Sequence, residues 1–104
     1  MHAAALRAVS EPRRRQILRL VWDQERPAGD IAASFDVTFG AISQHLRVLH
    51  DAELVSVRRD GRRRLYLARR EQLGPLREVL EDLWRSGLEE LRTLAEAEER
   101  GASA

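Results

Sequence analysis

The sequence predicts a mainly α-helical fold with a small β-hairpin. Apolar residues recur at helical spacing along most of the chain, whereas short apolar stretches flank Asp60-Gly61, a dipeptide that favours a tight hairpin turn. The chain has 104 residues, 43% hydrophobic and 34% charged, as expected for a globular domain with a modest core. We therefore expect about five helices and a two-stranded hairpin in one domain over residues 1–100, followed by a disordered tail over residues 101–104.

Two short helices are expected at the start of the chain. Leu6 and Val9 indicate the first helix, which should end near Ser10-Glu11-Pro12. Pro12 should open the second, because the first position of a helix needs no backbone N–H. The apolar face of this second helix consists of Ile17, Leu18, Val21 and Trp22.

Two more helices are expected on either side of a turn at Asp36-Val37. Residues 26–29 should break the second helix, and Asp30 should cap or begin a short third helix that reaches Phe35. Thr38 should then cap a fourth helix that extends to Asp51. The buried stripe of the fourth helix should consist of Ile42, Leu46 and Leu49.

The last helix is expected over residues 74–99, with Pro75 in its first turn. Its apolar stripe is wide for a terminal helix of a small domain, which predicts a homodimer interface completed by the first helix. The alternative is that this helix folds back on its own core. The interface residues expected are Leu6, Leu76, Leu80, Leu83, Trp84, Gly87, Leu91 and Leu94.

Charge is distributed unevenly along the chain. Residues 1–70 contain 14 arginines and 8 acidic residues, a net charge of +6, whereas residues 71–104 contain 4 arginines and 9 acidic residues, a net charge of −5. Such asymmetry predicts a part that binds a polyanion. The hairpin over residues 54–68 should pair Leu54, Val55 and Val57 with Leu65 and Leu67, and its tip carries five arginines, Arg58, Arg59, Arg62, Arg63 and Arg64.

The fourth helix and the hairpin together predict DNA binding. A helix that offers hydroxyl, amide and guanidinium groups to base edges, followed by a cationic hairpin for the backbone, is the arrangement of a winged helix-turn-helix. Gln44 is the main candidate for base recognition, because its amide can pair bidentately with adenine. Some wing arginines must point away from DNA, since strand neighbours alternate faces. The DNA contacts expected are Thr38, Phe39, Gly40, Ala41, Ser43, Gln44, His45, Arg47, Arg58, Arg62, Arg63 and Arg64.

Several of these assignments have a structural alternative. Phe39 could touch a thymine methyl group or be buried, and Arg47 could contact phosphate or pair with Asp51. Gly40 disfavours a helix but would let the backbone approach DNA closely. His45 is expected to pack between helices or contact phosphate. Arg13, Arg14 and Arg15 could form an anion site at a helix start, or be buried or paired with acidic residues.

Other classes of function are disfavoured by the composition. The chain has no cysteine, which excludes disulfides and thiolate metal sites. Its apolar runs are too short to span a bilayer, and its start is too short for a signal peptide, so a cytoplasmic location is expected. No Gly-rich phosphate loop and no His and carboxylate constellation indicate an enzyme.

Across nearly its whole length the chain resembles the ArsR family of winged helix-turn-helix repressors. The matching stretches are residues 10–18, which resemble the start of that family's second helix, residues 42–49, which resemble its recognition helix, and residues 54–67, which resemble its wing. The resemblance implies a homodimer that binds a two-fold symmetric operator and represses transcription until an effector intervenes. A protein-interaction module without specific DNA binding is the alternative function.

The sequence departs from the metal-sensing members of this family. Those members carry cysteines near the third helix, or Asp and His ligands along the last helix. Here the third helix has no cysteine and the last has no histidine. His45 and His50 lie about 140° apart on one helix, so they cannot share an ion. No metal or cofactor is therefore expected. The protein could sense a small apolar molecule near Trp22 and Trp84, or it could be an autorepressor governed only by its own concentration.

Overall fold

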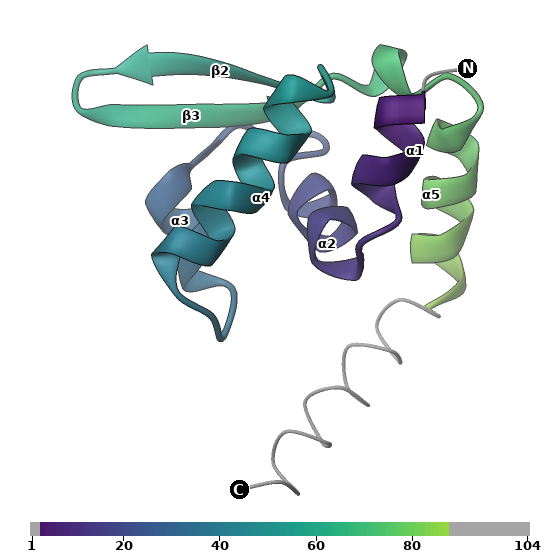
Figure 1. Cartoon of the computed structure of the whole chain (residues 1–104), viewed down its shortest axis with the longest axis horizontal. Helices are drawn as coiled ribbons and strands as arrows, with labels where there is room; N and C mark the ends of the chain where they lie inside the picture. Colours follow the sequence, from purple (N-terminus) through teal and green to yellow (C-terminus); the bar gives the residue numbers. More distant parts are fainter. Residues whose placement is uncertain (1–2, 88–104) are drawn as a thin grey trace, which may run out of the picture. The chain divides into compact units, whose positions relative to one another are not determined.

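The computed structural model describes residues 3–87. The chain divides into two compact units, Met1–Gly74 and Pro75–Ala104. The first unit has the order helix, helix, strand, helix, helix, strand, strand, and it ends in a 3-10 helix (Figure 1). Its elements are α1 (Ala3–Val9), α2 (Pro12–Leu20), β1 (Arg26–Pro27), α3 (Ala28–Ala33), α4 (Phe39–Asp51), β2 (Val55–Asp60), β3 (Arg63–Ala68) and the 3-10 helix Arg70–Leu73.

Helix α2 begins at Pro12, as the sequence predicts. The Glu11 side chain caps it by accepting a hydrogen bond of 3.0 Å from the backbone N–H of Arg14. The preceding helix α1 ends against the same turn, because the Arg14 and Arg15 side chains donate to its last carbonyl groups. Positive charge at a helix C-terminus also complements the helix dipole. These contacts join α1 to the start of α2.

Helix α3 begins earlier than expected. Pro27 is its N-cap residue and Asp30 lies in its first turn, so Asp30 is not the residue that begins it. The segment expected only to break α2 also forms a strand, β1, in which Arg26 pairs with Tyr66 and Pro27 pairs with Leu65. The sheet is therefore antiparallel with the order β1-β3-β2. Strand β1 connects the base of the two-stranded wing to α3.

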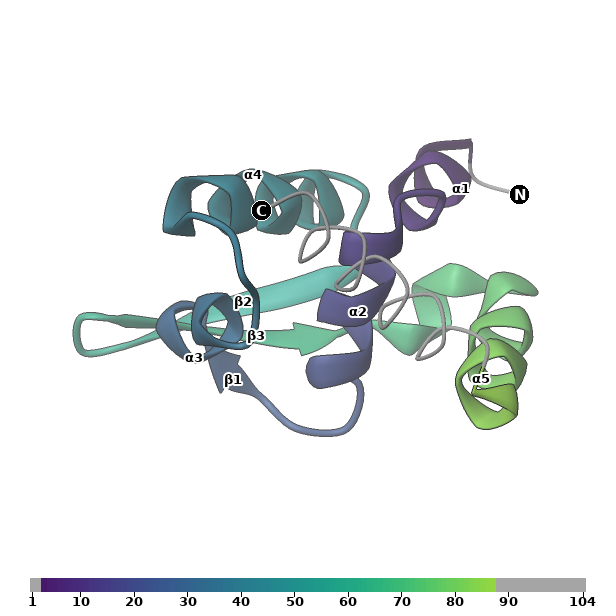
Figure 2. The same ribbon diagram turned by 90° about the horizontal axis from the view of Figure 1, so that it is seen from below.

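The wing differs from its predicted register by one residue. Asp60 pairs with Arg63, so Gly61 and Arg62 form the two-residue loop. Gly61 has a φ of 64°, which glycine adopts without strain and which type II′ hairpin turns require at their first position. As a result Val57 lies opposite Tyr66 and Val55 lies opposite Ala68, not opposite the two leucines. The hairpin tip extends past α3 and α4 (Figures 1 and 2).

The core of the first unit lies between the helices and the base of the sheet. Helix α4 contacts α1, α2, α3 and β2, and α3 also contacts β1 and β3. In α1 the buried residues are Ala5, Ala8 and Val9, which leaves Leu6 49% exposed. The largest fully buried side chains of this unit are Ile17, Leu18, Val21, Ile31, Ile42, Leu49, Leu54 and Val55.

The second unit contains α5 (Leu76–Ser86). This helix ends where Gly87 adopts the left-handed conformation, with a φ of 77°. Compared with the helix expected over about residues 74–99, α5 begins two residues later and ends at Ser86. Residues 88–99 of that prediction lie outside the described residues. None of the helices within residues 3–87 has the length and apolar character needed to span a membrane.

Candidate nucleic-acid interface

Helix α4 presents a polar face opposite its buried one. Thr38 caps it, accepting a hydrogen bond of 3.1 Å from the Ala41 N–H through its Oγ1 atom. Ile42, Leu46 and Leu49 are buried, as expected. Because residues four apart share a face of a helix, burial of this stripe leaves the other side exposed. The exposed side chains of this helix include Ser43, Gln44 and Arg47.

The first turn of α4 carries two residues that the fold itself does not explain. Phe39 is 59% exposed, so of the two alternatives that its spacing left open, burial is excluded. A Cβ atom at Gly40 would meet only Thr38 Oγ1, at 3.9 Å, so packing within the protein does not require glycine. The first turn of α4 therefore has an exposed aromatic ring, that of Phe39, next to Gly40, a residue without a side chain.

Two of the wing arginines are held by acidic residues. Arg58 forms a bidentate ion pair with Glu25, with an Nε to Oε2 distance of 2.7 Å and an Nη2 to Oε1 distance of 2.8 Å. This hydrogen bonding lowers the pKa of Glu25 and raises the pKa of Arg58. Arg63 donates to Asp60 at 2.9 Å, across the last pair of the hairpin. Both guanidinium groups are therefore partly neutralised within the protein.

Three other wing arginines have no such neighbour. Within residues 3–87, Arg59, Arg62 and Arg64 form no hydrogen bond or ion pair with another side chain. Arg59 and Arg64 also lie directly opposite each other in the hairpin, an arrangement of like charges that destabilises a sheet. Sequence reasoning did not include Arg59 among the candidate contacts. A Gly61-Arg62 loop would have placed Arg59 opposite Arg64.

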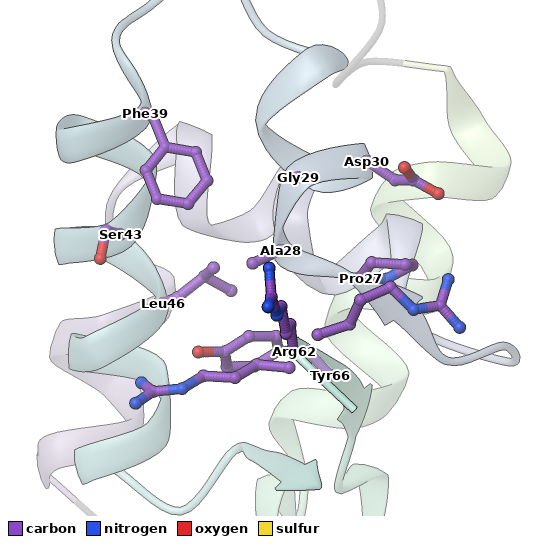
Figure 3. A pocket seen from close by; sticks show the side chains of 11 residues that line it. Pro27, Ala28, Gly29, Asp30, Phe39, Ser43, Leu46, Arg62 and Tyr66 are labelled. Carbon is purple, nitrogen blue, oxygen red and sulfur yellow. The ribbon is translucent and has the colours of Figure 1, made fainter. Parts of the chain in front are cut away.

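An open cleft lies between α4 and the wing. Its volume is about 530 Å³, and α3, α4 and the wing all contribute to its lining. Phe39, Leu46 and Tyr66 point into it from α4 and β3, Ser43 lies on its α4 side, and the Arg62 side chain lies across its middle in this view (Figure 3). The cleft therefore combines an apolar floor with cationic side chains of the wing tip.

His45 lies on the other side of α4 from this cleft. Its side chain is only 22% exposed, with Nδ1 3.3 Å from the Arg14 guanidinium and Nε2 4.0 Å from the Glu11 carboxylate. Burial lowers the pKa of His45, Glu11 opposes the shift, and the charges of Arg14 and Arg13 add to it. This position is that of a helix-packing residue, the first of its two expected roles.

Arginines 13–15 are engaged within the protein. The Arg14 Nε and Nη2 atoms donate to the carbonyl oxygens of Ala8 and Arg7, and Arg15 donates to that of Val9. The Arg13 guanidinium stands 5.9 Å from the centroid of the Phe35 ring. The structural alternative therefore describes these three residues better than an anion site does.

Comparison with known proteins places the chain among bacterial regulators. Residues 11–57 match the family described as bacterial regulatory protein, arsR family. The HTH-type transcriptional regulator Rv2034 of Mycobacterium tuberculosis is 33% identical over 94 residues, which cover 90% of this chain and 88% of Rv2034. The chain belongs to the ArsR family. Its winged helix-turn-helix and its exposed α4 face are thus those of an ArsR-family DNA-binding transcriptional regulator.

Two further relatives have a named role or a named oligomeric state. The transcriptional repressor SdpR of Bacillus subtilis is 44% identical over 55 residues, 53% of this chain and 61% of SdpR, less than two thirds of that protein. The solution structure of Mb0332 from Mycobacterium bovis has a TM-score of 0.69 and 29% identity, covering 83% of this chain and 80% of that one. Mb0332 is described as a homodimeric winged helix-turn-helix domain.

The residues expected at an ArsR dimer interface fall into three groups. Leu6 is exposed on α1, in the first unit. In α5, Leu80 and Trp84 are buried within a single chain, Leu76 and Leu83 are half-buried, and Gly87 ends the helix. Leu91 and Leu94 lie outside the described residues.

Proposed function

We propose that this ArsR-family regulator is a homodimeric repressor that binds an inverted-repeat operator through the helix at residues 38–51 and the wing at residues 54–68. The observation that carries the proposal is the set of exposed cations without acidic neighbours. The side chains of Arg47 on α4 and of Arg59, Arg62 and Arg64 on the wing form no hydrogen bond or ion pair with another residue within residues 3–87. A polyanion would supply the missing negative charge.

Gln44 is proposed to read adenine from the middle of the exposed face of α4. Ser43, Ala41 and the start of the helix at Thr38 would lie along the same groove, and Arg47 would contact phosphate one turn further on. In the wing, the side chains of Arg59, Arg62 and Arg64 are proposed to contact the phosphate backbone of DNA. Arg58 and Arg63 are proposed to act mainly through their ion pairs, which hold the hairpin in position.

The repressor role and the homodimer are supported by the relatives and by one exposed side chain. SdpR is named a repressor, and Mb0332 is described as homodimeric. Leu6 is a large apolar side chain of α1 that is 49% exposed, which supports its contact with a partner. Two protomers related by a two-fold axis would place their recognition helices about one helical turn of DNA apart, roughly 34 Å.

The proposal is tested by selecting bound sequences from a random duplex pool and measuring affinities by fluorescence anisotropy. We expect an enriched inverted repeat. Gln44→Ala should lose about 1–3 kcal/mol of discrimination per contacted base, whereas Arg62→Ala should weaken binding to operator and random DNA alike. If no sequence is enriched, the protein-interaction alternative replaces this function. A reporter gene downstream of the selected operator then distinguishes repression from activation.

A further inference from the structure

The fold leaves Phe39 uncovered at the end of α4 that a helix-turn-helix directs toward base edges. At 59% exposed, Phe39 contrasts with the other phenylalanine of the chain, Phe35, which is half-buried beneath Arg13. Its ring points into the open cleft between α4 and the wing (Figure 3). An aromatic ring gains free energy when it leaves water, so this position favours contact with an apolar group of a ligand.

The position of Phe39 on the helix determines which part of a bound ligand its ring can contact. Ser43, one turn later, lies about 40° from Phe39 around the helix axis, and Gln44 lies about 140° away. Phe39 therefore occupies the wing side of the polar face and Gln44 the opposite side. Gly40 adds no side chain beside the ring, and only Thr38 Oγ1 lies within 4 Å of the position that its Cβ would take. A base edge can thus come close to the ring.

We propose that Phe39 reads thymine, through contact between its ring and the 5-methyl group in the major groove. Thymine is the base that presents a methyl group there, and phenylalanine is one of the side chains that contact it. The thymine lies on the wing side of the base pair that Gln44 contacts. This inference rests on the proposed function, since it requires α4 to enter the major groove.

The test compares operators in which one thymine at a time is replaced by deoxyuridine, which removes only the methyl group. With the unmodified protein, deoxyuridine at one position of each half-site should weaken binding about fourfold per half-site, which corresponds to ~0.8 kcal/mol for one buried carbon. Phe39→Ala should weaken binding to the thymine operator by a similar factor and should bind both operators equally. Because Phe39 is exposed, this variant should keep its fold, which circular dichroism checks.

Gln44→Ala is the matched control on the same helix. It should lower affinity for the operator yet retain the fourfold effect of the methyl group, because its contact is with a different base pair. Equal affinity of the unmodified protein for all thymine and deoxyuridine operators would overturn the inference, as would an undiminished methyl effect in Phe39→Ala. In both cases operator binding survives, and so does the proposed function. Failure to select any operator would overturn both.

Discussion

Gly40 is a residue whose identity the protein's own packing does not require. Alanine there would place a Cβ atom in ordinary contact with Thr38 Oγ1, at 3.9 Å, and would favour the helix by up to about 1 kcal/mol. We therefore expect Gly40→Ala to raise the free energy of unfolding, measured by urea denaturation, while it weakens operator binding. A variant that is more stable but binds the operator more weakly would show that Gly40 serves close approach to DNA and not the stability of the fold. Unchanged affinity would remove Gly40 from the interface.

His45 should make stability depend on pH. Burial lowers its pKa in the folded protein, so below the ordinary histidine value, near 6.5, the unfolded chain binds more protons than the folded one. Stability should consequently fall as the pH falls from about 6.5 toward the lowered pKa, and be unaffected by His45 above that range.

Substituting His45 with glutamine tests this assignment. Urea midpoints measured at pH 7.5 and pH 5.5 should differ less in His45→Gln than in the unmodified protein. An equal loss of stability on acidification in both proteins would assign the pH dependence to other groups.

At the scale of single elements, the wing gives a direct comparison between neighbouring arginines. Arg59 faces Arg64 and has no acidic partner within the described part of the chain, whereas Arg58 is held by Glu25. Arg59→Gln should reduce the slope of log affinity against log salt by about 1 per protomer, because one phosphate contact is lost. Arg58→Gln should change that slope less. The reverse order would return Arg58 to the interface in place of Arg59.

Helix α4 and the hairpin were predictable because their signals are local. Thr38 lies where a cap is needed, the buried stripe has helical spacing, and glycine stands in the hairpin loop. Strand β1 was not predictable, because it has two residues, one of them a proline, and exists only through pairing with β3. The roles of Arg58 and Glu25 depend likewise on a contact between segments 33 positions apart in the sequence.

The end of α5 shows a different limit of sequence reasoning. Gly87 continues the apolar spacing of the stripe, so the pattern predicts one long helix, yet glycine also adopts the left-handed conformation that terminates helices. Periodicity alone does not distinguish these two uses of glycine. Exposure of Phe39 was equally undecided, because its spacing to Ile42 and Leu46 would also fit the buried stripe.

At the scale of the whole molecule, the dimer should be required for tight operator binding. Leu6→Glu places a charge on the exposed side of α1, where the folded monomer tolerates it because Leu6 is 49% exposed. We expect sedimentation at micromolar concentration to show a dimer for the unmodified protein and a monomer for Leu6→Glu, with a matching loss of affinity. Leu6→Gln, similar in size and uncharged, should have a smaller effect. A dimeric Leu6→Glu would place the interface elsewhere.

The complex with DNA should not respond to zinc, cadmium, copper or arsenite. The chain has no cysteine, and within residues 3–87 no three histidine, aspartate or glutamate side chains are grouped as a metal site would need. Titration of the operator complex in chelator-treated buffer, followed by anisotropy, measures this. Stoichiometric release at low micromolar metal would contradict the prediction.

The guanidinium of Arg14 gives the molecule an internal linkage. It belongs to α2, bonds the end of α1 through the carbonyls of Ala8 and Arg7, and reaches the recognition helix through His45. A tilt of α1 would strain these contacts, so the orientation of α4 is coupled to that of α1, the helix that carries Leu6. If two protomers join through α1, as proposed, this coupling would also affect the distance between their α4 helices on the proposed operator.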